Sequence, residues 1–188
     1  MEVATGSASS EPVAAISWGA IFAGALVAVA ASLILFILGS GLGLAAVSPW
    51  QALGGSDSTP AVLAAIWLII TQWLAAGLGG FLTGRLRVRW IGTHAHEVFF
   101  RDTAHGLVTW ALATLLIAAL ALSGSAALVG AGGHALDAAT AGASASAAQA
   151  ARSAAATGSL LAALSMLVGA FIACVAAALG GQHRDLHP

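Results

Sequence analysis

The stretch AVLAAIWLIITQWLAAGLGGFLTGRLRVR, residues 61–89, decides the fold. Residues 61–84 carry no charged side chain, and arginines then follow at positions 85, 87 and 89. An α-helix rises 1.5 Å per residue, so about 20 apolar residues cross a hydrocarbon core of about 30 Å. The stretch therefore predicts a membrane-spanning helix that ends at a charged membrane surface.

Three further apolar runs flank this one, at Val13–Val47, Ala104–Leu122 and Ser159–Gly181. Of the 188 residues, 60% are hydrophobic and 7% are charged, against about 25% charged in a soluble domain. The pattern predicts an all-α integral membrane bundle of four transmembrane helices. Because the first run would reach about 50 Å as one helix, well beyond the hydrocarbon core, we expect it to loosen at Gly39-Ser40-Gly41-Leu42-Gly43.

The connection between the third and fourth runs, residues 123–158, is rich in alanine, glycine and serine. We expect it to lie outside the membrane and to be partly helical, with a helix from about Leu136 to Ala155, because alanine favours helix and the glycines before it do not. The rest of the chain divides into a tail at 1–12, three helices within 13–122, a fourth helix at 159–181 and a tail at 182–188.

Arginine placement predicts the orientation. Four of the six arginines lie in the short connection 85–103, whereas the first connection carries only Asp57. Short loops rich in basic residues stay in the cytoplasm. We therefore expect loop 85–103 and both termini to be cytoplasmic, and connection 123–158 to be periplasmic.

This orientation has a direct test. A cysteine introduced near Asp57 should react with an impermeant thiol reagent in intact cells, and one near Trp90 should not, because only the first lies outside the membrane. The reverse labelling pattern would overturn the topology.

Small residues recur every four positions on two of the predicted helices, where they allow close helix contact in lipid. These positions either pack against another helix, within the chain or in an oligomer, or face lipid; they are Gly80 and Gly84 on the second helix and Gly169, Ala173, Ala177 and Gly181 on the fourth. Thr71 and Gln72 are the most polar pair near the middle of a span. An unpaired amide in hydrocarbon is costly, so Gln72 is expected to bond to another helix or to line a substrate path.

The segment THAHEVFFRDTAHG, residues 93–106, gathers three histidines, two acids and an arginine. A metal site would use His94, His96, Asp102 and His105, but His94 and His105 would lie about 16 Å apart on one straight helix. The alternative is a polar joint, with Glu97, Arg101 and His105 forming an i,i+4 ladder and Asp102 paired with an arginine of 85–89. A cytoplasmic pH sensor built from the histidines is a third interpretation.

Membrane lipids are the first expected partner. Arg85, Arg87 and Arg89 alternate with Leu86 and Val88, which is typical of contact with anionic headgroups. No basic cluster is dense enough for nucleic acid, and the chain lacks lysine, so a Walker-type phosphate loop is excluded. We expect no cofactor and no enzymatic activity.

Three segments, ISWGAIFAGA (16–25), WLIITQWLAAGLGGFLTGRLR (67–87) and HEVFFRDTAHG (96–106), resemble a group of uncharacterised bacterial inner-membrane proteins, some of them labelled PhnA-like. The resemblance covers about the first two-thirds of the chain. It implies a bacterial inner-membrane location and transfers no catalytic residue.

Two functions remain open at this point. The first is a non-enzymatic oligomeric or accessory subunit of a membrane complex, which predicts a solid bundle packed along Gly169–Gly181. The second is a small channel or transporter for an ion or neutral solute, which predicts a water-filled path past Gln72.

Overall fold

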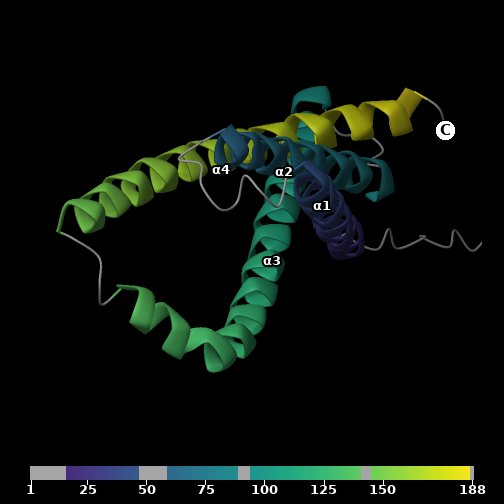
Figure 1. Cartoon of the computed structure of the whole chain (residues 1–188). Helices are drawn as coiled ribbons and strands as arrows, with labels where there is room; N and C mark the ends of the chain where they lie inside the picture. The colour runs from purple at the N-terminus through teal and green to yellow at the C-terminus, as the bar shows by residue number, and fades with distance from the viewer. Residues whose placement is uncertain (1–15, 47–58, 89–93, 141–144, 187–188) are drawn as a thin grey trace, which may run out of the picture.

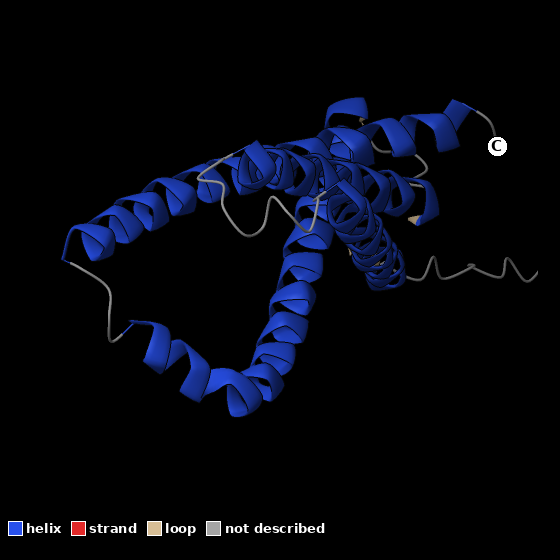
Figure 2. Ribbon diagram, viewed as in Figure 1, coloured by secondary structure: helices blue, strands red, loops and turns tan. Residues whose placement is uncertain are grey.

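The computed structural model describes residues 16–46, 59–88, 94–140 and 145–186. It contains four helices, α1 (Trp18–Ala46), α2 (Thr59–Leu86), α3 (Ala95–Thr140) and α4 (Ala145–Leu186). No strand occurs within these ranges, and Figure 2 accordingly shows no red arrow. Figure 1 shows α1, α2 and α4 gathered at one end of α3.

All four helices are long and apolar enough to cross a membrane, over Trp18–Gly43, Val62–Leu86, His96–Ser123 and Ala156–Leu186. The chain is therefore a multi-pass membrane protein. The predicted fold class, an all-α bundle of four such helices, is confirmed. Trp18 begins α1 and is exposed.

The expected loosening at Gly39–Gly43 is wrong, because α1 continues through these glycines to Ala46. The Trp67 ring of α2 packs against Gly39, where it leaves no room for a side chain, and its Nε1 donates to the Leu35 carbonyl at 3.0 Å. Breaking a helix in hydrocarbon would leave backbone groups without partners. That cost outweighs the weak helix propensity of glycine.

Helices α3 and α4 extend much further than their apolar runs. With 46 and 42 residues, they measure about 69 Å and 63 Å, roughly twice the hydrocarbon thickness. Of the helix expected at 136–155, residues 136–140 belong to α3 and 145–155 to α4, and residues 141–144 lie outside the described residues. We call residues 124–140 and 145–155 the arms. Figure 1 shows both arms outside the packed bundle, with the arm of α3 turned at the lower end of that helix toward the side where α4 begins.

Burial is confined to one half of the spans. Buried positions fall within 20–29 of α1, 71–87 of α2, 102–113 of α3 and 165–181 of α4. The start of α1, the end of α2, the start of α3 and the end of α4 meet here, and we call this the polar end. In the opposite half, large apolar side chains such as Ile37, Leu63, Leu122 and Leu160 are exposed.

Close backbone contact joins α2 to α4 along the small-residue positions. A methyl group at Gly80 would collide with the backbone of Ala173, and one at Gly84 would collide with the Ala177 carbonyl. Gly181 lies against the Asp102 carboxylate of α3. The strip on α4 thus lies inside the bundle, since Ala173 and Ala177 are fully buried.

Candidate functional site at the polar end

A buried ion pair forms the centre of the polar end. Arg87 lies directly after the last residue of α2, and Asp102 lies in the second turn of α3. Arg87 Nε donates to Asp102 Oδ1, and both side chains are almost fully buried, at 0% and 3% exposed. Arg87 Nη1 also donates to the Val88 carbonyl at 3.1 Å, whereas Nη2 has no partner among the described residues. The predicted pairing of Asp102 with an arginine of 85–89 is confirmed.

The three arginines predicted to contact lipid headgroups therefore do not share one environment. For Arg87 the prediction is wrong, because the ion pair turns its side chain into the bundle. Arg85, in the last turn of α2, is exposed and keeps the predicted role as an expectation. Arg89 lies outside the described residues.

His105 ties α3 to the start of α1. Its Nε2 accepts a hydrogen bond from the Ser17 backbone N–H at 2.9 Å, and its Nδ1 lies 2.6 Å from the Arg101 carbonyl. A carbonyl can only accept, so the ring carries its proton on Nδ1 and leaves Nε2 free to accept. His105 thereby satisfies one of the N–H groups that the first turn of a helix leaves without an intrahelical partner.

Ser17 also contacts α2. Its Oγ accepts from the Val88 backbone N–H at 3.4 Å, and its carbonyl accepts the Ile21 N–H at 3.1 Å as α1 begins. One serine therefore links the ends of α1, α2 and α3. The sequence analysis did not single it out, although serine just before an apolar run is a common helix start.

Arg184 of α4 caps the end of α2 in the same manner. Its Nη1 donates to the carbonyls of Gly84, at 3.0 Å, and Arg87, at 3.1 Å. Asp185 accepts from the same guanidinium at 2.9 Å. Carbonyls in the last turn of a helix lack intrahelical donors, so a cation from a neighbouring helix both satisfies them and complements the helix dipole.

The remaining members of segment 93–106 do not form a ligand set. Arg101 bonds Glu97 at 2.6 Å, as the predicted ladder requires, but His105 bonds the Arg101 backbone instead of its side chain. Asp102 and His105 face inward while His94 and His96 are exposed. Within the described ranges no group of three or more His, Cys, Asp or Glu side chains could hold a metal. The structure therefore contradicts a metal site built from these four residues.

Between the ion pair and the middle of the spans, two threonines join three helices. Thr83 Oγ1 lies 2.8 Å from Thr109 Oγ1 and 2.9 Å from the Gly79 carbonyl, and the Ala20 carbonyl of α1 is 3.3 Å away. Both threonines are fully buried. The sequence analysis missed them, although Asp102, His105 and Thr109 follow the spacing of one helix face.

Nearer the middle of the spans, Gln72 Oε1 accepts a bond from Ser165 Oγ of α4 at 3.1 Å. The expected interhelical bond of Gln72 is therefore present. Its neighbour Thr71 is 5% exposed, and the Thr71 hydroxyl finds no hydrogen-bond partner in the described part of the chain.

Comparisons of the chain with protein-family models, with curated proteins and with solved structures find no match. The geometry alone must therefore indicate the function. At the polar end, the ionisable and hydroxyl groups are mostly engaged with one another and with helix ends. Such an arrangement holds the four helix ends together, which is a structural role.

Proposed function

We propose that this chain is a non-enzymatic subunit of a membrane assembly, formed with further copies of itself or with other membrane proteins. We place it in the bacterial inner membrane, with both termini cytoplasmic and the arms periplasmic, as arginine placement and the resemblance suggest. The packed half of the bundle is the anchor in this proposal, and the arms are the part that engages a partner.

The observation that carries the proposal is the length of α3 and α4. Their arms continue as helix beyond the spans His96–Ser123 and Ala156–Leu186 and leave the bundle (Figure 1). The arm sequences are mainly alanine, glycine and serine, with Asp137 and Arg152 as their charged residues. Most of the stability of a helix in a protein comes from packing against other segments, and the arms lie outside the bundle. Packing against another chain would stabilise them.

The small-residue seam supports the subunit over the transporter. Gly80, Gly84, Ala173 and Ala177 hold α2 and α4 in backbone contact, and the Thr83–Thr109 bond lies between α2 and α3 in the same half of the bundle. Along this seam the helices are in close contact, as expected of a subunit.

The test compares the whole chain with a variant whose residues 126–155 are replaced by a Gly/Ser linker of equal length. In lipid nanodiscs or in membranes, the whole chain should appear as a defined oligomer, or should crosslink to a membrane protein from a photoreactive residue at the exposed Gln149. The linker variant should lose the assembly while its bundle unfolds at an unchanged temperature. A whole chain that is monomeric and captures no protein through position 149 would contradict the proposal.

A further inference from the structure

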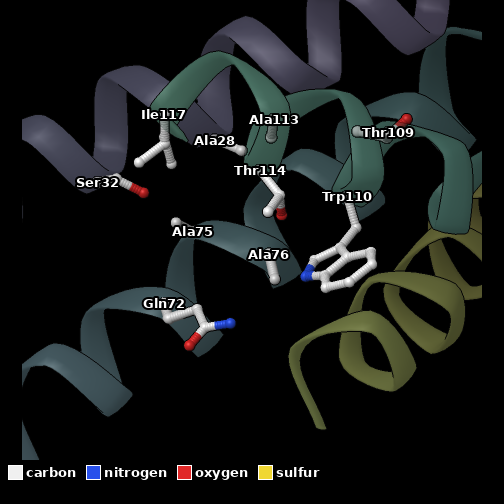
Figure 3. A pocket seen from close by; sticks show the side chains of 10 residues that line it. All are labelled: Ala28, Ser32, Gln72, Ala75, Ala76, Thr109, Trp110, Ala113, Thr114 and Ile117. Carbon is white, nitrogen blue, oxygen red and sulfur yellow. The ribbon is translucent and has the colours of Figure 1, made fainter. Parts of the chain in front are cut away.

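A small cavity lies close to the middle of the spans, where α1, α2 and α3 meet. It measures about 40 Å³. Figure 3 shows its lining, which combines alanines with polar side chains from all three helices. The polar ones are Ser32, Gln72, Thr109, Trp110 and Thr114. The cavity adjoins the polar end only at Thr109 and plays no part in the proposed assembly.

Two hydrogen-bond donors converge beside the cavity. The Gln72 side-chain oxygen accepts a hydrogen bond from Ser165, so the amide N–H groups of Gln72 remain available as donors. Gln72 Nε2 and Trp110 Nε1 lie 3.1 Å and 3.3 Å from the point where a side chain on Gly169 would begin. In Figure 3 the two nitrogens point toward each other. No hydrogen bond from either nitrogen to an acceptor is found within the described residues, neither atom is fully buried, and two donors cannot satisfy one another.

The position of these donors makes an acceptor necessary. At the depth of Gln72 and Trp110 the surroundings are hydrocarbon, where an unsatisfied N–H costs several kcal/mol. Elsewhere in the bundle, indole donors at comparable depth are satisfied. Trp73 Nε1 donates to the Ser165 carbonyl at 3.3 Å, and Trp67 Nε1 donates to the Leu35 carbonyl at 3.0 Å. Among Trp67, Trp73 and Trp110, only the indole N–H of Trp110 has no acceptor within the described residues.

We propose that the cavity is a binding site for water, held by Gln72 Nε2 and Trp110 Nε1. A cavity needs about 10–15 Å³ on this measure to hold one water, together with two to four polar partners. At about 40 Å³ the space is large enough for water. The hydroxyls of Ser32 and Thr114 also line it and offer both donors and acceptors. Thr109 also lines the space, but its hydroxyl is already bonded to Thr83.

Indole N–H signals of tryptophan labelled with ¹⁵N, in the full chain in nanodiscs, test the proposal. The Trp110 signal, identified by its loss in Trp110→Phe, should show magnetisation exchange with water and deuterium exchange at least about ten times faster than that of Trp73, whose bond to a carbonyl makes it the internal control. In Ser32→Leu, which fills the cavity from α1, the water signal at Trp110 should disappear.

Three results would overturn the proposal. The first is a Trp110 indole as protected as that of Trp73, which would mean a dry cavity with the Gln72 amide turned so that its oxygen accepts from the indole. The second is magnetisation transfer to the Trp110 indole N–H from lipid acyl chains instead of from water. The third is a water signal that persists unchanged in a folded Ser32→Leu protein.

Discussion

Asp102→Ala should be the most damaging single substitution in the chain, lowering the free energy of unfolding by about 3–5 kcal/mol. The change leaves the Arg87 guanidinium buried without its counter-charge, and Arg87 is 2% exposed. Arg87 Nη2 already lacks a partner within the described chain, so no spare acceptor is at hand. Thermal or denaturant unfolding in one detergent, followed by circular dichroism, measures the loss.

Two controls separate an unpaired charge from a general loss of packing. Glu97→Ala breaks the Arg101–Glu97 pair, whose side chains are 29% and 47% exposed, and should cost less than about 1 kcal/mol. Arg87→Met combined with Asp102→Leu removes both charges and should recover most of the stability lost in Asp102→Ala. If Asp102→Ala is as mild as Glu97→Ala, the buried pair does not hold the polar end together.

Gly84→Ala should cost about 1–3 kcal/mol, the second-largest effect, although it adds only one methyl group. The new Cβ would collide with the Ala177 carbonyl and approach the Gly181 nitrogen. Both are backbone atoms, so no rotamer change can relieve the contact and α2 must move away from α4. Close approach of small residues provides much of the attraction between helices in lipid, and the separation would weaken the whole seam.

Gly41→Ala is the matched control, because a methyl group at Gly41 meets nothing within 4 Å. Alanine is also the better helix former, so this variant should be neutral or slightly more stable. Equal unfolding temperatures for Gly84→Ala and Gly41→Ala would show that α2 and α4 do not meet at Gly84.

Features that depend on local composition could be predicted from the sequence. Uncharged runs such as 61–84 predict membrane helices because length and hydropathy are properties of a single segment. Pairing of Asp102 with an arginine was predictable as well, since a carboxylate beside an apolar run needs a counter-charge. The sequence does not predict which arginine pairs with Asp102, because Arg85, Arg87 and Arg89 share the same local pattern. Only the position of α3 beside α2 selects Arg87.

Features that depend on neighbouring helices were missed. The recurrence of small residues every four positions identifies a packing face on α4 but does not show which helix packs against it. Gly106 of α3 touches Ala173 and Ala177 on this face, yet it belongs to no such repeat. The continuation of α3 past its membrane span was not predicted, because the apolar run stops near Leu122 whereas the alanine-rich helix continues beyond it. Likewise, only the fold brings Ser17 and His105 together across 88 residues.

The central claim is that four helices cross a bilayer and that the polar groups at one end join them. Extraction of isolated membranes with alkaline carbonate, without detergent, tests it most directly. The whole chain should remain in the membrane pellet and should enter the soluble fraction only after detergent is added. A chain that stays in the supernatant when membranes are pelleted, with no detergent present, would contradict the account.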